Sequence, residues 1–133
     1  MKKLIIMSLS IFGVHLILNI IFSSLGEDLF LRNPEIWKPM GPSWMLKINI
    51  LYFMFSFIFS YFYLRLKDKF FGEGIKKGIF FGLFIFLFSY FPRMGIMYFS
   101  MTVPGKLILI WIITGAVRYT AFGITASCVE SRV

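Results

Sequence analysis

The sequence predicts an all-α protein, a bundle of four transmembrane helices with both termini in the cytoplasm. Of its 133 residues, 59% are hydrophobic and only 15% are charged, whereas soluble domains average nearer half apolar and about a quarter charged. The 18 phenylalanines would be hard to bury in a water-soluble core of this size. Several apolar runs approach the roughly 20 residues that a helix needs to cross about 30 Å of hydrocarbon. We therefore expect one integral membrane domain over residues 1–133.

Turn signals divide the apolar sequence into four spans, at about residues 4–25, 44–64, 75–99 and 106–128. The first follows the sequence MKK and has about 22 residues, longer than the 7–15 apolar residues of a typical signal peptide. It therefore predicts an uncleaved helix. The third span contains Pro92, where a helix is expected to kink because proline lacks an amide hydrogen.

Basic residues predict the orientation of the bundle. Eight lie on one side of the membrane in this arrangement and five on the other, and they are densest in the short loop 65–77. Cytoplasmic loops of membrane proteins carry the excess of Lys and Arg. We therefore expect a protein of the cytoplasmic membrane, with this loop and both termini on the cytoplasmic side. The eight are Lys2, Lys3, Arg65, Lys67, Lys69, Lys76, Lys77 and Arg132.

The charge and cysteine content exclude several classes of function. The net charge of +8 lies in short clusters between apolar runs, so membrane topology explains it better than nucleic-acid binding does. A single cysteine, Cys128, excludes an intrachain disulfide and a cysteine-rich metal site. No paired carboxylates suggest a catalytic centre, and we predict neither catalytic residues nor a metal site. The sequence does not indicate a cofactor.

Glycines recur at every fourth position where the third span begins. Gly74, Gly78 and Gly82 share one face of a helix, in a pattern that lets a second backbone approach closely. We expect this face to pack against another helix, either within the chain or between protomers of a homo-oligomer.

Polar residues also lie within the spans, and we expect them to face inward because lipid offers them no hydrogen-bond partner. His15 lies about 16 Å into the membrane and Arg118 about 15 Å from the same side, at a rise of 1.5 Å per residue. Since arginine does not lose its proton, its charge at the mid-plane requires a compensating group. The candidate ligand-binding residues are His15, Asn19, Asn49, Ser89 and Arg118.

Four motifs give the chain a resemblance to a loose group of small, uncharacterised bacterial four-helix membrane proteins. They are His15 in the first span, the segment PEIWKPMGPSW, the segment GEGIKKGIFFGL, and the fourth span beginning VPGKLILIWIITG. The resemblance covers most of the chain and implies an architecture but no activity. Members of that group often have an acidic residue at the position that Arg118 occupies in this chain. This departure argues against a metal or proton site built from a histidine and a carboxylate.

Two classes of function remain open. The polar interior suggests that the chain binds or transports a small anionic, quinone-like or lipid ligand, because convergent polar groups in an apolar bundle are the usual binding site. Alternatively, the protein is a structural or accessory subunit whose glycine face docks on a larger membrane complex. An enzyme is the weakest of the classes considered.

Overall fold

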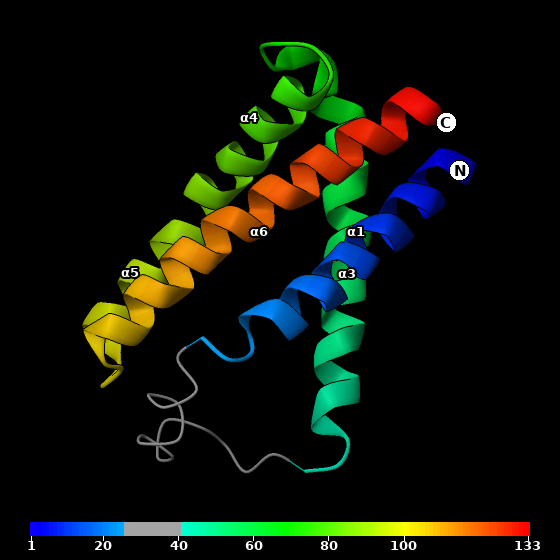
Figure 1. Cartoon of the computed structure of the whole chain (residues 1–133). Helices are drawn as coiled ribbons and strands as arrows, with labels where there is room; N and C mark the ends of the chain where they lie inside the picture. The colour runs from blue at the N-terminus through cyan, green and yellow to red at the C-terminus, as the bar shows by residue number, and fades with distance from the viewer. Residues whose placement is uncertain (26–40) are drawn as a thin grey trace.

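The computed structural model of the chain describes residues 1–25 and 41–133, and over these residues it is helical without any strand (Figure 1). The predicted four-helix bundle is confirmed. The first part of the Trp- and Pro-containing segment before the second helix lies outside the described residues. The helices are α1 (Lys2–Phe22), α3 (Trp44–Leu66), the short 3-10 helix η2 (Lys67–Lys69), α4 (Ile75–Ile85), the π-helix η3 (Phe86–Tyr90), α5 (Phe91–Ser100) and α6 (Gly105–Arg132).

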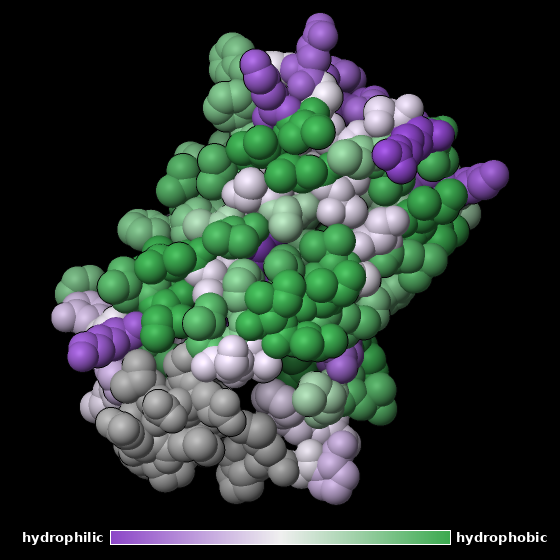
Figure 2. All heavy atoms as spheres, viewed as in Figure 1, coloured by the Kyte–Doolittle hydropathy of each residue, from purple (hydrophilic) through white to green (hydrophobic). Residues whose placement is uncertain are grey.

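Four helical segments are long and apolar enough to cross a membrane: Lys2–Phe22, Trp44–Lys69, Ile75–Ser100 and Gly105–Arg132. Large apolar side chains cover the outside of the bundle, and Figure 2 shows them along the whole body of the molecule. Hydrophilic atoms gather mainly toward the end where the termini lie. Monomeric soluble proteins rarely expose apolar patches larger than a few hundred Å², so this surface indicates a multi-pass membrane protein.

The third segment passes through Pro92 without ending. Proline cannot donate a hydrogen bond to the carbonyl four residues earlier, and its ring collides with that carbonyl in a regular α-helix. Here the turn before it widens into the π-helix η3, and the helix then continues as α5 to Ser100. The helix therefore meets Pro92 with a π-turn, a common way to absorb such a conflict.

Helix α6 lies at the centre of the packing. It runs alongside α4 and also packs against α1, which in turn packs against α3 (Figure 1). Buried aromatic rings fill the space between these helices. The ring of Phe81 from α4 meets those of Phe59 and Tyr63 from α3 edge-on, with centroids 5.1 Å apart in each pair. The ring of Phe122 from α6 joins the same cluster, with its centroid 5.9 Å from that of Phe59, so one aromatic core connects α3, α4 and α6.

Two glycines let α4 approach the backbone of α6. A Cβ atom added at Gly78 would overlap the carbonyl oxygen of Gly123, and one added at Gly82 would overlap that of Tyr119. Both glycines are buried. The contact is therefore backbone against backbone, as small residues four apart allow in membrane helices.

Gly74 does not share this contact. It precedes α4 with a φ of 53°, a conformation that favours glycine, and an added Cβ atom would meet open space. Its carbonyl instead accepts a hydrogen bond from the hydroxyl of Ser127, at 2.5 Å. Of the three glycines in the predicted stripe, Gly78 and Gly82 thus pack against α6, whereas Gly74 is the residue from which α4 begins.

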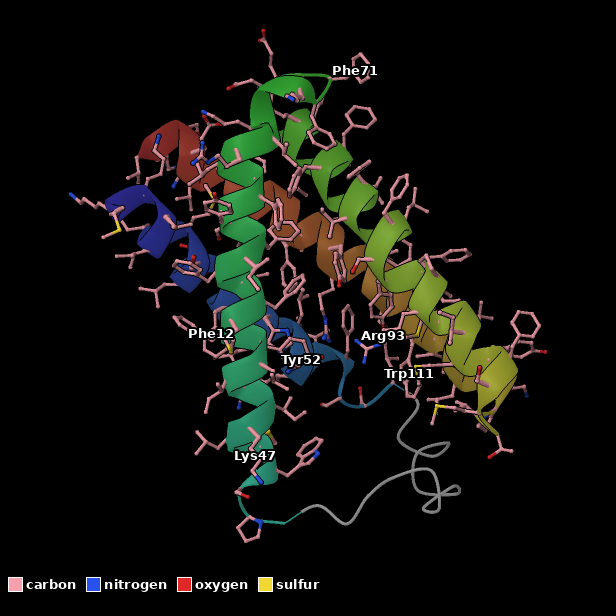
Figure 3. All side chains as sticks on the ribbon, turned by 180° about the vertical axis from the view of Figure 1, so that it is seen from behind. Phe12, Lys47, Tyr52, Phe71, Arg93 and Trp111 are labelled. Atoms are coloured by element: carbon pink, nitrogen blue, oxygen red, sulfur yellow. The ribbon has the colours of Figure 1, made fainter. Side chains whose placement is uncertain are left out.

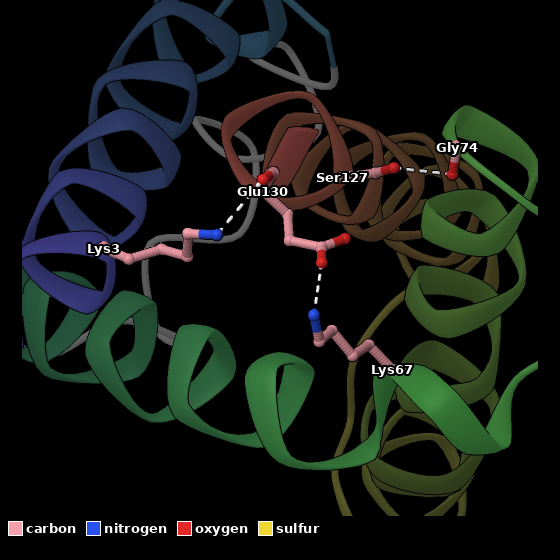
Figure 4. A network of polar contacts seen from close by, with 5 residues as sticks. All are labelled: Lys3, Lys67, Gly74, Ser127 and Glu130. Carbon is pink, nitrogen blue, oxygen red and sulfur yellow. Dashed lines mark hydrogen bonds and ion pairs between the residues drawn. The ribbon is translucent and has the colours of Figure 1, made fainter. Parts of the chain in front are cut away.

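Both termini lie at the same end of the bundle as the loop after α3, and polar contacts on α6 join them (Figure 4). The ammonium of Lys67 pairs with the carboxylate of Glu130, and the ammonium of Lys3 donates to the Glu130 carbonyl at 3.3 Å. An even number of membrane crossings requires this arrangement.

Candidate functional site

Arg118 lies in the middle of α6, and its guanidinium reaches across to α1. Its Nη2 donates a hydrogen bond to Oδ1 of Asn19 at 2.9 Å. The guanidinium carbon also lies 5.9 Å from the centre of the Phe22 ring and 6.0 Å from that of Tyr52. Aromatic faces attract cations at these distances. Arg118 is thus held by one neutral oxygen and two rings, while its buried Nε has no hydrogen-bond partner among the described residues.

Asn19 links Arg118 to His15. Arginine can only donate hydrogen bonds, so the amide oxygen of Asn19 must face Arg118 and the amide nitrogen must face His15. That nitrogen lies 2.9 Å from Nε2 of His15. The amide therefore donates to Nε2, which assigns the proton of the neutral imidazole to Nδ1. In the described part of the chain, Nδ1 is buried and has no partner.

Tyr52 of α3 covers this row of polar groups. Its ring stacks on the fully buried ring of His15, with centroids 3.7 Å apart and planes at 27°. The same ring also lies close to the guanidinium of Arg118. Three helices therefore meet at one aromatic-covered polar row, with α1 supplying His15 and Asn19, α3 supplying Tyr52 and α6 supplying Arg118.

No carboxylate balances Arg118 among the described residues. The acidic residues there are Asp68, Glu73 and Glu130, and all three belong to the end of the bundle where the termini lie. The same described ranges, 1–25 and 41–133, contain no group of three His, Cys, Asp or Glu residues that could hold a metal ion. The chemistry that this row offers is therefore hydrogen-bond donation and positive charge.

The structure brings three of the five candidate residues together and leaves two apart. His15, Asn19 and Arg118 form the row. Asn49 is half-buried one turn before Tyr52 on α3, and its side chain makes no hydrogen bond within the described part of the chain. Ser89 lies in the π-turn η3 with its side chain exposed.

Sequence reasoning missed the two aromatic residues of the site, Phe22 and Tyr52. Tyr52 lies on the same helix face as the polar residues Asn49 and Ser56, since it is three residues after one and four before the other. That spacing was the available signal, but a tyrosine in a span with many phenylalanines does not stand out. Phe22 had no signal of its own.

Comparison with protein-family models, with curated proteins and with solved structures found no match to this chain. Function is therefore inferred from the residues and geometry of the site.

Proposed function

We propose that the protein binds, within the membrane, a lipophilic molecule that presents an oxygen acceptor to Arg118. The observation that carries this proposal is the arginine in the middle of α6, whose hydrogen-bond acceptor is the neutral side chain of Asn19. Intramembrane ionisable residues are candidates for function by default. The shared chemistry of the ligand is an oxygen that accepts hydrogen bonds, in a neutral carbonyl compound such as a quinone or in an anionic head group.

The hydrogen bond to Asn19 and the rings of Phe22 and Tyr52 hold Arg118 in place, and their energies indicate that its charge can still attract a ligand. Placing an arginine at the centre of a membrane helix costs at least about 2.5–3.5 kcal/mol on insertion scales. A hydrogen bond to a charged group contributes about 1.5–3 kcal/mol, and an aromatic face adds roughly 0.5–2 kcal/mol. These contacts offset the cost of burial without supplying a negative charge.

Neighbouring residues would orient the arginine for a ligand. Two hydrogen bonds hold the side chain of Asn19. Its oxygen accepts from Arg118, and its nitrogen donates to His15. The rings of Phe22 and Tyr52 restrict the guanidinium plane and give the ligand an apolar boundary. Asn19 is thus a positioning residue, and Arg118 is the residue that would touch the ligand.

Ligand binding by purified protein in dodecyl maltoside tests the proposal. The probes are decylubiquinone as a lipophilic carbonyl compound, dodecyl phosphate as a lipophilic anion, and sodium chloride as a small inorganic anion. We expect at least one lipophilic probe to raise the thermal unfolding temperature of the wild type, and this shift to vanish in Arg118→Leu. Lys106→Leu removes the same charge from an exposed position at the start of α6 and serves as the matched control.

Two outcomes would reject this function. In one, no lipophilic probe distinguishes the wild type from Arg118→Leu. In the other, Arg118→Leu raises stability and binds every probe as the wild type does. If protein purified from its native membrane also carried a stoichiometric partner chain, the accessory-subunit class would then be favoured.

We also propose that the protein lies in the cytoplasmic membrane of the cell, with the end that carries both termini inside. Support comes from the basic loop 65–77, which lies at that end. A single cysteine introduced at Asp68 in a Cys128→Ser background should resist a membrane-impermeant maleimide in intact cells and react after lysis. Labelling in intact cells would overturn the orientation.

A further inference from the structure

The π-turn brings Tyr90 of η3 against α6, one turn away from Arg118. A Cβ atom added at Gly115 would lie 2.9 Å from Cδ1 and 3.0 Å from Cζ of the Tyr90 ring, so the tyrosine fills the space that this glycine leaves. The Tyr90 ring also lies beside that of Tyr119, with centroids 5.5 Å apart. The turn that absorbs Pro92 therefore places a tyrosine pair next to the Arg118 row.

A second arginine, Arg93, lies in α5 just after the same π-turn. Arg93 is three residues after Tyr90, and Figure 3 shows it extending from α5 toward the side of the bundle on which Tyr52 lies. Arg118 lies on that side as well, with its guanidinium carbon 6.0 Å from the centre of the Tyr52 ring. Both guanidinium groups are thus directed toward the side of the bundle where Tyr52 lies.

The two arginines lie at different depths in the bundle. Arg93 is seven residues before the end of α5, about 10 Å along the helix axis, whereas Arg118 is 13 residues after the start of α6, about 20 Å. Both of these helix ends lie opposite the end that carries the termini. Arg93 is therefore nearer to that surface by about 10 Å, toward the level at which the head groups of membrane amphiphiles lie.

We propose that the ligand of the Arg118 site is a lipophilic anion and that Arg93 is its second binding residue. This inference rests on the function proposed above and narrows its ligand class. Two positive charges share one aromatic neighbourhood, and the described part of the spanning helices supplies no carboxylate to either. A neutral carbonyl ligand would accept hydrogen bonds but leave both charges uncompensated, whereas a phosphate or carboxylate head group would oppose both of them.

The aromatic surroundings favour an amphiphile over a small hydrated ion. A chloride ion would exchange most of its water for the rings of Phe22, Tyr52, Tyr90 and Tyr119 and keep only the guanidinium groups as hydrogen-bond donors, and burying an ion with so few partners is costly. A head group carried by an alkyl chain enters from the lipid, and its chain stays in an apolar solvent. The site therefore suits a phosphate or carboxylate on an alkyl tail.

Titration calorimetry of dodecyl phosphate and decylubiquinone into the full chain in dodecyl maltoside tests this inference. We expect dodecyl phosphate to bind more tightly than decylubiquinone. Arg93→Gln should weaken dodecyl phosphate binding about tenfold or more, the loss expected for a charge-assisted hydrogen bond. Arg93 and Lys106 are both exposed, so Lys106→Gln is a control matched in charge and exposure. Lys106 lies 12 residues before Arg118 on α6, about 18 Å along the helix axis, and its loss should change the affinity by less than about twofold because a screened charge at that distance contributes little.

The arrangement of variants separates the two proposals. Arg93→Lys keeps the charge without the planar fork, so it should bind with intermediate affinity, and it provides a second test if Arg93→Gln fails to fold. Binding of decylubiquinone that depends on Arg118, with no binding of dodecyl phosphate, would overturn the anion and leave the proposed function standing. Dodecyl phosphate binding that depends on Arg118 but not on Arg93 would overturn the role of Arg93 alone. Failure of both probes on the wild type would overturn both proposals.

Discussion

The closest approach between helices gives the sharpest test of the fold, through the substitution Gly123→Ala in α6. The new Cβ atom would lie 2.8 Å from the carbonyl carbon of Gly78 and 3.0 Å from the amide nitrogen of Gly82, and it would overlap the Gly78 carbonyl oxygen. Ordinary contacts between such atoms are about 3.5–4.0 Å. Because all of these neighbours are backbone atoms, no side chain can rotate away, and the helices must separate by roughly 1 Å or more.

The expected cost follows from a comparison with a second glycine. Overpacking of this kind destabilises a folded protein by about 1–3 kcal/mol. Replacing glycine by alanine also favours a helix by up to about 1 kcal/mol. Gly13 of α1 provides the control, because a Cβ atom added there meets nothing within 4 Å. The helix-propensity gain is common to both substitutions, so the difference between the two variants isolates the packing cost of about 1–3 kcal/mol.

Unfolding in mixed micelles of dodecyl maltoside and sodium dodecyl sulfate, followed by circular dichroism, measures this difference. Gly13→Ala should unfold at the wild-type detergent fraction or slightly above it, and Gly123→Ala clearly below it. If Gly123→Ala and Gly13→Ala unfolded together, the close approach of α4 and α6 would be absent, and the reasoning from the glycine contact would be refuted.

Two further predictions concern polar contacts and use the same unfolding assay. Asn19→Leu removes the hydrogen-bond acceptor of Arg118 and should lower the free energy of unfolding by about 1.5–3 kcal/mol. Asn49→Leu is the matched control and should lower it much less. Equal effects of the two substitutions would show that the bond to Arg118 does not stabilise the fold. Glu130→Gln breaks the ion pair with Lys67, in which the side chains of Lys67 and Glu130 are 26% and 24% exposed. We therefore expect the free energy of unfolding to fall by no more than about 1 kcal/mol, and this loss to disappear in high salt. A loss insensitive to salt would show that the pair acts in another way.

The helices and their packing face were largely readable from the sequence because their signals are periodic. Apolar runs and turn residues predict four spans, and the fourfold spacing of Gly78 and Gly82 predicts a close helix contact. The spacing could not show that Gly74 falls before the start of α4, since the end of a helix depends on the loop that precedes it. It also could not name Gly123 as the partner, because pairing between helices is a tertiary property.

The candidate site was predicted in part. His15 and Arg118 were placed together from their equal depth in the membrane, and the structure joins them through Asn19 instead of by direct contact. Depth gives the level of a residue but not the direction of its side chain around the helix. Direction depends on how each helix is rotated against its neighbours, and this is why Asn49 and Ser89 remain outside the row.

The rotation of α6 connects the glycine contact to the arginine. Gly123 fixes one face of α6 against α4. Arg118 lies five residues earlier, about 140° around the helix axis from Gly123, and its side chain reaches Asn19 of α1. If α4 moves away, α6 is free to turn, and the guanidinium loses the geometry that a single 2.9 Å hydrogen bond maintains. We therefore expect Gly123→Ala to weaken the binding of dodecyl phosphate as well as the fold, although residue 123 touches no part of the site. Weaker stability with unchanged affinity would mean that the α1–α6 contact orients Arg118 by itself, without help from α4.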